Sequence, residues 1–283
     1  MMQGLARRVR ELAWSCLAWL AGSVLACVVG SMSSGSASKM SGLFHLCDTI
    51  RRRPDEAPEL EPQLLELVQE LLSGTYRKVW THDRRFRAKR VEEREVTPSG
   101  FRAVRVRVVD RDSYAALKAK FDEDRRKLAG LGADKTEHKP LTDPWSTGRD
   151  GVCNEWLLMH GTDEQAAKQI ESTGFSVQHA RPDGLCGAAL YFAECSTKAD
   201  EYASPVNSDA HRLVILCRVL GGRVHYTEER RPDRKRLIEM LQAGECDSIL
   251  NNREACSKTF KEFVVARPSQ VVPECVVEYR QEL

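Results

Sequence analysis

Apolar residues recur along the chain with two periods, and each period predicts a type of secondary structure. A period of about 3.6 residues predicts helices over residues 59–72 and 113–128, and Gly74 is placed to end the first of them. Strict alternation of valines with arginines over residues 104–108 predicts a half-buried strand. These patterns are typical of elements that bury one face against a core.

Short strands dominate the pattern after residue 155. Mostly apolar runs predict strands over residues 156–159, 189–193, 213–220, 263–266 and 275–279. Short helices are predicted over residues 163–173 and 196–203, and a turn around Pro268 and Pro273 is expected to separate the last two strands. Several strands with few, short helices predict an α+β fold rather than a doubly wound sheet.

The helix over residues 163–173 carries signals at both ends. Thr162 and Gln165 have the spacing of a capping box, and Gly174 is placed to end the helix. The preceding residues 131–150 are rich in Gly, Pro, Thr and Asp, which predicts a loop.

The first forty residues differ from the rest of the chain. Arginines precede an uncharged, mostly apolar run over residues 12–30, and serines follow it. This order is typical of a signal peptide or a signal anchor, and a helical run of this length would nearly match the ~30 Å hydrocarbon core of a bilayer. The segment is therefore a membrane anchor, a cleaved targeting peptide or neither, since Met32 and Met40 could each start a shorter chain. The arginines before the run favour a cytoplasmic N-terminus. The arginines at 51–53, which follow the run, weaken this inference.

The charges of the chain nearly cancel. There are 43 basic and 41 acidic residues, for a formal net charge of +2, which argues against nucleic-acid binding through overall charge. A local basic excess over residues 76–110 is interpreted as the solvated face of the predicted strand. A hydrophobic fraction of 42% excludes a mostly disordered chain.

The ten cysteines do not form a metal-binding pattern. The closest pair, Cys186 and Cys195, is nine residues apart, so no CxxC clip is present and no metal site is predicted. Several cysteines lie in apolar runs where a small buried side chain fits, which favours free thiols over disulfides.

Three short motifs carry residues that are suited to chemistry. The first lies where the strand over 156–159 meets the helix over 163–173. The second is the run over 187–193 with the helix that follows it, and the third begins the strand over 263–266. The candidate residues in these motifs are His160, Gly161, Thr162, Tyr191, Tyr202 and Glu262. Each residue taken alone is more often structural than functional.

Taken together and in this order, the motifs resemble the catalytic domain of the poly(ADP-ribose) polymerase (PARP) family, the diphtheria-toxin-like ADP-ribosyltransferases. The resemblance is carried by the stretches LLMHGTDEQAAKQIESTGF, LCGAALYFAECSTKADEYA and TFKEFVVARPSQVVPECVVEY. It implies a mixed or antiparallel split sheet with short flanking helices. It also divides the chain into an apolar segment and linker (1–40), a helical lead-in (41–78) and a catalytic domain (79–283).

The resemblance implies an H-Y-E triad of His160, Tyr191 and Glu262 that acts on NAD⁺ as substrate. His160 would hydrogen-bond the 2′-hydroxyl of the nicotinamide ribose, Tyr191 would stack on the nicotinamide ring, and Glu262 would lie at the scissile bond. These residue types suit the reaction, because cleaving a ribose–pyridinium bond gives an oxocarbenium-like transition state that a nearby carboxylate stabilises.

Four further positions follow from the resemblance. Gly161 would hold the nicotinamide carboxamide through its backbone, Thr162 would lie beside the ribose, and Tyr202 would close the side of the ring opposite Tyr191. Ala199 stands where several family members carry a serine that hydrogen-bonds the carboxamide, and losing one neutral hydrogen bond costs about 1 kcal/mol.

The expected function is NAD⁺-dependent transfer of ADP-ribose to a protein side chain, on another protein or on the chain itself, with release of nicotinamide and without a metal. In the family a glutamate at the third triad position is associated with chain extension, so both single and repeated transfer stay open. Residues 222–249 replace the family's acceptor-side loop and leave the acceptor undetermined. The alternative is a module that binds NAD⁺ or ADP-ribose without turnover, which Ala199 favours.

The partners expected from these features are NAD⁺ and a protein acceptor, whereas nucleic acid is not expected. Localisation stays open: an anchor formed by residues 12–30 would tether the domain to a membrane. A cytoplasmic catalytic domain would suit both NAD⁺ and reduced thiols.

Overall fold

Two four-stranded sheets form the centre of the fold in the computed structural model, which describes residues 37–79, 81, 98–131, 153–206 and 210–283. The strands of the first sheet, in spatial order, are β1 (Gly100–Val108), β8 (Val271–Glu282), β4 (Arg212–Leu220) and β2 (Glu155–Thr162). Those of the second are β3 (Leu190–Phe192), β7 (Lys261–Val265), β6 (Ser248–Asn252) and β5 (Val224–Thr227). All neighbours pair antiparallel except β5 and β6, which are parallel. The split sheet confirms the predicted α+β fold class.

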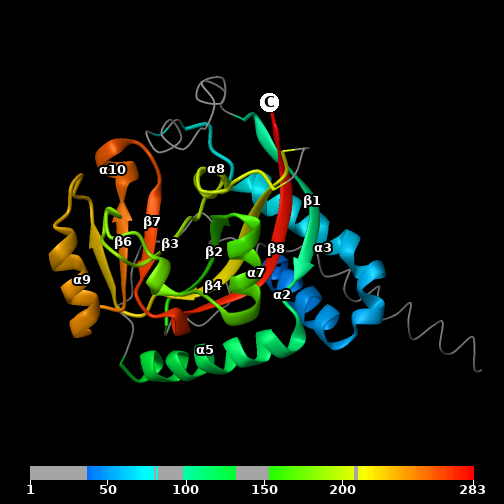
Figure 1. Ribbon diagram of the computed structural model, residues 1–283, viewed down its shortest axis with the longest axis horizontal. Coiled ribbons are helices and arrows are strands. Elements are labelled where there is room, and N and C mark those ends of the chain that lie inside the picture. Colours follow the sequence, from blue (N-terminus) through cyan, green and yellow to red (C-terminus); the bar gives the residue numbers. More distant parts are fainter. Residues whose placement is uncertain (1–36, 80, 82–97, 132–152, 207–209) are drawn as a thin grey trace, which may run out of the picture.

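Helices cover the sheets on three sides. They are α2 (Ala37–Arg52), α3 (Ala57–Gly74), α5 (Arg111–Leu131), α7 (Glu164–Thr173), α8 (Ser196–Asp200), α9 (Arg234–Ala243) and α10 (Arg253–Ser257). Figure 1 shows α2 and α3 beside β1 and β8, α5 along the foot of the molecule, and α9 and α10 at the opposite end beside β6. The helices predicted over 59–72 and 113–128 are confirmed as α3 and α5.

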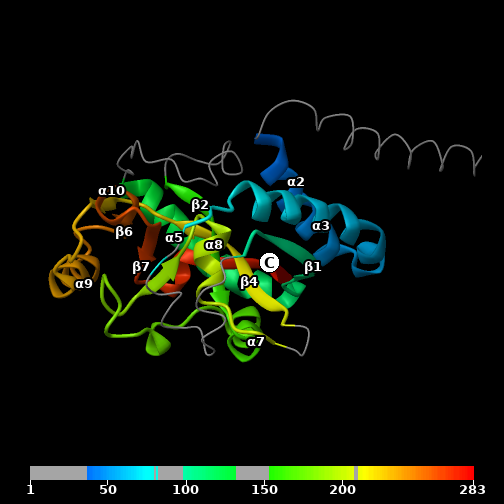
Figure 2. The same cartoon turned by 90° about the horizontal axis from the view of Figure 1, so that it is seen from above.

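Strands β2 and β4 of the first sheet are buried on both faces. Leu157 of β2 and Val214 of β4 pack with α2 and α3, whereas their neighbours Leu158 and Ile215 pack with α7 and the second sheet. Figure 2 shows α3 and α7 on opposite sides of this sheet. A strand buried on both faces reads as a continuous apolar run, which explains the hydrophobic stretch over residues 213–217 of β4.

The predicted strand over residues 104–108 is confirmed as part of β1, but its alternation is interrupted. A register shift against β8 lies between Ala103 and Arg105, so Ala103 and Val106 are buried while Val104 is 39% exposed. A bulge inserts one residue and reverses which face the following residues occupy. The inward position that strict alternation implies for Val104 is therefore wrong.

The turn between the last two strands is also shorter than predicted. A 3₁₀ turn over Pro268–Gln270 joins β7 to β8, whereas Pro273 lies inside β8. The pairing of β8 with β4 shifts register beside this proline, between Leu216 and Cys217 of β4. A proline has no amide hydrogen to donate, so it fits where an irregularity already interrupts the ladder.

Residues 222–252 form a strand–helix–strand unit that the sequence patterns did not reveal. In this unit β5 leads through α9 to the parallel strand β6. The apolar side chains of α9, Leu237 and Leu241, are buried against Ile249 and Val264 of the second sheet. Because α9 buries only a narrow apolar stripe among many charges, its periodicity is weak in the sequence.

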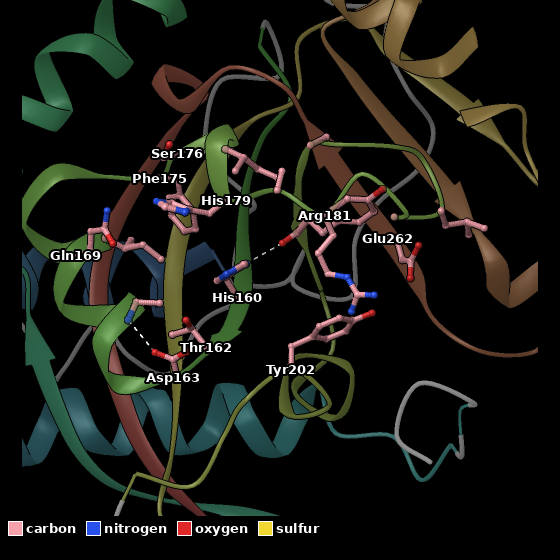
Figure 3. Close-up of a pocket in the computed structure, with 18 of the residues that line it drawn as sticks. His160, Thr162, Asp163, Gln169, Phe175, Ser176, His179, Arg181, Tyr202 and Glu262 are labelled. Atoms are coloured by element: carbon pink, nitrogen blue, oxygen red, sulfur yellow. Dashed lines mark hydrogen bonds between the residues drawn. The ribbon is translucent and has the colours of Figure 1, made fainter. Parts of the chain in front are cut away.

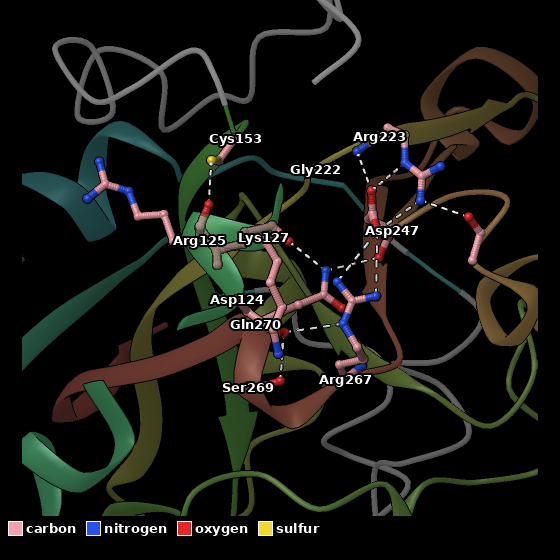
Figure 4. Close-up of polar contacts among 12 residues, drawn as sticks. Asp124, Arg125, Lys127, Cys153, Gly222, Arg223, Asp247, Arg267, Ser269 and Gln270 are labelled. Carbon is pink, nitrogen blue, oxygen red and sulfur yellow. Dashed lines mark hydrogen bonds and ion pairs between the residues drawn. The ribbon is translucent and has the colours of Figure 1, made fainter. Parts of the chain in front are cut away.

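A polar network fixes this unit to the rest of the fold (Figure 4). Asp247, at the entrance to β6, accepts hydrogen bonds from the backbone nitrogen and Nε of Arg223, both at 2.9 Å. Arg267, which follows β7, places Nε 3.2 Å from Asp124 of α5 and Nη2 3.5 Å from Asp247. Gln270 donates to the backbone oxygen of Asp247 at 3.0 Å. The second sheet is thus tied to α5 at one corner.

Arg51, near the end of α2, joins the lead-in helices to the first sheet. Its Nη2 lies 2.7 Å from the Glu274 carboxylate of β8, its Nε donates to the carbonyl of Val109 at 3.2 Å, and its guanidinium lies 3.4 Å above the Tyr114 ring. Arg218 reaches the other carboxylate oxygen of Glu274 at 3.5 Å. A buried carboxylate needs such partners, so α2 contributes directly to the core around β8.

Several expectations fall on residues outside this description. The apolar run over 12–30, most of the loop over 131–150 and much of the basic stretch over 76–110 lie outside the described residues. Within the ranges that the structure does describe, no helix combines the length and the hydropathy that crossing a bilayer requires. None of the eight cysteines in those ranges is joined to another by a disulfide.

Candidate active site

A cavity of about 1020 Å³ opens between α7, β2, β7 and the loop that leads into β3. Figure 3 shows His160, Thr162, Tyr202 and Glu262 around it. A volume of this size is typical of cofactor and substrate sites. Of the predicted site residues, those that line the cavity are His160, Thr162, Tyr191, Tyr202 and Glu262.

The cavity lies where β2 separates from β3. The two strands are joined by one isolated bridge, in which Met159 and Ala193 exchange backbone hydrogen bonds at 2.8 and 2.9 Å. Two residues farther along β2, Gly161 directs its N–H and C=O to this same side, because strand backbone groups alternate. Beyond this bridge, the contact between β2 and β3 is made by a side chain: the imidazole of His160 bonds the backbone carbonyl of Tyr191. The two sheets diverge from this point.

His160 presents one defined nitrogen to the cavity. Its Nδ1 lies 2.9 Å from the Tyr191 carbonyl, which can only accept, so Nδ1 carries the proton and Nε2 of the neutral ring is an acceptor. The rings of Phe175 and Phe192 hold the imidazole, with centroids at 5.1 and 5.7 Å. Burial lowers the pKa of His160 below its ordinary value of 6.5, and the hydrogen bond to Tyr191 offsets only part of that shift.

The lowered pKa of His160 predicts an acid-dependent loss of stability. As the pH falls below 6.5, the unfolded chain takes up a proton at this histidine while the folded chain does not, so the free energy of unfolding decreases. Urea unfolding of the wild type and of His160→Gln at about pH 7.5 and 5.5 measures this difference. We expect the variant to lose less stability on acidification, and an identical loss in both proteins would contradict a half-buried ring that stays neutral.

Gly161 packs against the backbone of Ala199, and neither residue is among those that line the cavity. A Cβ at Gly161 would lie 1.8 Å from the backbone oxygen of Ala199 in α8. The missing side chain at position 161 therefore allows α8 to pack directly on β2. This is a structural reason for the glycine, in addition to the backbone contact with the carboxamide that the family resemblance implies.

Replacing Gly161 with alanine is expected to lower the free energy of unfolding by about 1–3 kcal/mol, since α8 has to move to admit the methyl group. Gly130→Ala is the matched control, because nothing lies within 4 Å of a Cβ at that helical position. That control should be neutral or stabilising by up to about 1 kcal/mol. Equal effects of the two substitutions in thermal unfolding would exclude the tight contact between Gly161 and α8.

The N-terminus of α7 differs from the predicted capping box. Asp163 is the capping residue, and its carboxylate accepts a hydrogen bond from the Ala166 amide at 2.8 Å. Thr162 is still the last residue of β2, and it is buried at the cavity wall. The capping box of Thr162 with Gln165 is therefore wrong, because the strand extends farther than predicted. Gly174 ends the helix with a φ of +82°, as predicted.

Tyr191 organises the loop that enters β3. Its hydroxyl accepts a hydrogen bond from the Cys186 amide and donates one to the Gly187 carbonyl, both at 2.8 Å. Gly187 has a φ of +89° and packs against Ile238 of α9. The loop is therefore held by the Tyr191 hydroxyl and by its contact with α9. The Tyr191 ring, held by its own hydroxyl, forms part of the cavity lining.

Lys198 is a site residue that the sequence reasoning missed. It is buried on α8, four residues before Tyr202, and its Nζ lies 3.0 Å from Glu201, 3.2 Å from the Tyr202 hydroxyl and 3.5 Å from Glu262. The spacing of four residues from Tyr202 was visible in the sequence. Its contact with Glu262, which lies 64 positions farther along the chain, was not.

Glu262 is buried at the cavity rather than solvated, with 7% of its surface exposed. It lies on β7 opposite Asn251 of β6. One carboxylate oxygen faces Lys198, whereas the other, Oε2, is buried without a hydrogen-bond partner in the structure. A buried oxygen without a partner is costly unless a ligand supplies a donor.

Three arginines add positive charge to the cavity. Arg181, in the loop before β3, makes two hydrogen bonds to Asp183 at 3.0 and 2.7 Å. Arg234 and Arg253 begin α9 and α10 and line the cavity near the second sheet. Within the described residues, no cluster of three or more His, Cys, Asp or Glu side chains is arranged to hold a metal ion.

Comparison with known protein families matches residues 133–281 to the poly(ADP-ribose) polymerase catalytic domain. The matched residues make up more than half of the chain and include every residue of the motifs described above. The chain belongs to this family. PARP catalytic domains are, as a family, NAD⁺-dependent ADP-ribosyltransferases, and the split sheet with its cavity is the fold of that activity. The match begins after α5, so α2, α3 and β1 lie outside it although they share the core.

Proposed function

We propose that this PARP-family chain is an active enzyme that transfers ADP-ribose from NAD⁺ to a protein side chain and releases nicotinamide. The observation that carries the proposal is the buried, unbonded Oε2 of Glu262 beside a cavity lined by a neutral histidine and two tyrosines. A carboxylate held in this way is available to a ligand hydroxyl and to developing positive charge.

The ground-state complex would use the cavity as follows. The nicotinamide ring stacks on Tyr191, with Tyr202 on its other side, because aromatic faces attract a flat cationic ring. The Nε2 of His160 accepts a hydrogen bond from a ribose hydroxyl, and the backbone of Gly161 faces the carboxamide on the open edge of β2. Thr162 lies beside the ribose.

In the reaction, the bond between ribose C1′ and the pyridinium nitrogen breaks, and its electron pair leaves with neutral nicotinamide. The ribose gains oxocarbenium character, which the negative charge of Glu262 stabilises. The acceptor atom then bonds to C1′, and any proton it carries is lost. Lys198 acts through Glu262 as a positioning residue, since its ammonium lies 3.5 Å from one oxygen and leaves the other for the ligand.

The second candidate is a module that binds NAD⁺ or ADP-ribose without turnover. Ala199 favours it, because this residue has no hydroxyl to offer the carboxamide and its side chain is not part of the cavity lining. The effect of that absence on binding is about 1 kcal/mol, which weakens affinity without removing a reacting group. The first candidate is therefore the better supported.

Nicotinamide release separates the two candidates. The purified chain is incubated with NAD⁺, free nicotinamide is quantified by chromatography, and NAD⁺ binding is measured by calorimetry on the same preparation. We expect binding with steady release of nicotinamide, and loss of release in Glu262→Ala. Binding without release would establish the module instead. Gel analysis of the modified protein would distinguish a single ADP-ribose from a chain.

The stacking role predicts that Tyr191→Ala raises the KM for NAD⁺ by about five- to thirtyfold, the equivalent of about 1–2 kcal/mol of ring contact. Tyr191→Phe is the matched variant, because it keeps the ring and removes only the hydroxyl bonds to Cys186 and Gly187. We expect a much smaller rise in KM for phenylalanine. Initial rates across a range of NAD⁺ concentrations test this, and equal KM values for the two variants would rule out stacking.

A further inference from the structure

A strongly basic surface adjoins the cavity at the start of α9. Between positions 230 and 236 the chain has five basic residues and one acidic residue. We call this set the α9 basic surface; its members are Arg230, Arg231, Arg234 and Lys235, and it excludes Arg236, which pairs with Glu245 at 2.8 Å.

Of the acidic residues at positions 228, 229 and 233, two are engaged elsewhere, whereas the exposed Glu229 directly precedes the α9 basic surface. Asp233 caps α9 by accepting hydrogen bonds from the backbone nitrogens of Lys235 and Arg236, and Glu228 bonds the hydroxyl of Tyr226. Lys235 has one distant partner, Glu239 at 3.9 Å, and is 86% exposed. Within the described ranges, the other three members of the surface form no ion pair, although Arg234 acts at longer range on Asp183, whose pKa it helps to lower. The charges of Arg230 and Arg231 are the most available to a partner.

The α9 basic surface is continuous with the cavity on the side of the second sheet. Arg234 lines the cavity, and its backbone oxygen lies near Gly187, in the loop that leads to Tyr191. Arg253 lines the same side, and within the described residues it too forms no ion pair. Glu262, with its unbonded buried oxygen, lines the same cavity as these arginines and His160 (Figure 3). A partner held here would place its side chains beside the reacting centre.

We infer that the α9 basic surface, together with Arg253, binds an acidic segment of the acceptor protein; the inference rests on the proposed transferase function. Unpaired arginines next to a cavity select a negatively charged partner and speed its encounter. A protein segment fits better than nucleic acid, because residues 228–236 contain no aromatic side chain on which a base could stack.

Peptide binding tests the surface without requiring turnover. A fluorescein-labelled peptide of alternating glutamate and glycine is titrated with the full chain, and its fluorescence anisotropy gives the dissociation constant. We expect binding that weakens as salt rises from about 50 to 200 mM, since exposed charges are screened. The matching lysine–glycine peptide should not bind.

A charge reversal on the surface supplies the decisive comparison. The triple variant Arg230→Glu/Arg231→Glu/Arg234→Glu should bind the acidic peptide at least about tenfold more weakly and should gain affinity for the lysine peptide. The control variant Arg105→Glu/Arg111→Glu/Lys120→Glu changes the net charge equally on β1 and α5, where none of the three residues lines the cavity. It should bind the acidic peptide within about twofold of wild type.

The possible outcomes separate this inference from the proposed function. Equal affinity of both triple variants for the acidic peptide would overturn the inference, whether or not the chain consumes NAD⁺. Tighter competition by a 5′-phosphorylated single-stranded oligonucleotide would overturn the choice of a protein segment. Gain of lysine-peptide binding by the reversed variant shows that it is folded. Peptide binding by a chain that never releases nicotinamide would leave the surface established and refute the transferase function on which its role as an acceptor site rests.

Discussion

Replacing Glu262 with glutamine is expected to reduce kcat by about 100- to 1000-fold while the dissociation constant for NAD⁺ changes little. Glutamine has nearly the same shape, so the cavity and its aromatic walls are retained. The negative charge that would stabilise the oxocarbenium-like transition state is removed, whereas bound NAD⁺ has not yet developed that charge at the ribose. Steady-state rates of nicotinamide release, with calorimetry for binding, give the two quantities separately.

Glu164→Gln is the matched control for this substitution. Glu164 begins α7 near the cavity without lining it, and it pairs with Lys168 on the exposed face of the helix. We expect its kcat to stay within about twofold of the wild-type value, because an exposed pair contributes little. A Glu262→Gln protein with the kcat of the wild type would show that the charge of this carboxylate is not used in the reaction.

Replacing Arg51 with leucine is expected to lower the free energy of unfolding by about 3–5 kcal/mol. Glu274 is fully buried, and the substitution removes the guanidinium that lies 2.7 Å from its Oε2. Arg218 and Tyr114 contact the other carboxylate oxygen, so they do not replace the lost bond. Denaturant unfolding followed by circular dichroism measures the difference.

Two control variants are needed to interpret the stability of Arg51→Leu. Arg53→Leu removes an exposed arginine just beyond α2, which pairs with Glu56 at 3.1 Å, and should cost no more than about 1 kcal/mol. The double variant Arg51→Leu/Glu274→Gln removes the buried charge as well and should be more stable than Arg51→Leu alone. A single variant as stable as Arg53→Leu would mean that α2 is only loosely attached to the catalytic core.

Much of the fold could be predicted from local patterns in the sequence. The amphipathic periods of α3 and α5 gave their boundaries to within a few residues, because each buries one continuous stripe. The apolar run of β4 was equally clear, since that strand is buried on both faces. The candidate site was recognised through motif order, and the structure brings the three distant segments of His160, Tyr191 and Glu262 to one cavity.

What the sequence could not reveal depends on contacts between distant segments. Lys198 becomes part of the site through Glu262, which reaches it only after β7 pairs with β3 and β6. The bulge that turns Val104 outward is set by pairing with β8, and the Asp163 cap follows from how far β2 extends along β4. The requirement for glycine at position 161 arises from α8, whose approach no local pattern indicates.

The central claim is transfer of ADP-ribose to protein, and one ratio tests it most directly. The full chain is incubated with NAD⁺ labelled in its adenylate half, and the protein is denatured and washed. ADP-ribose retained on protein is then divided by nicotinamide released in the same sample. We predict that the ratio approaches one while acceptor remains, and that both quantities fall together in Glu262→Gln. Nicotinamide release with no label retained on protein would contradict the claim and identify a hydrolase.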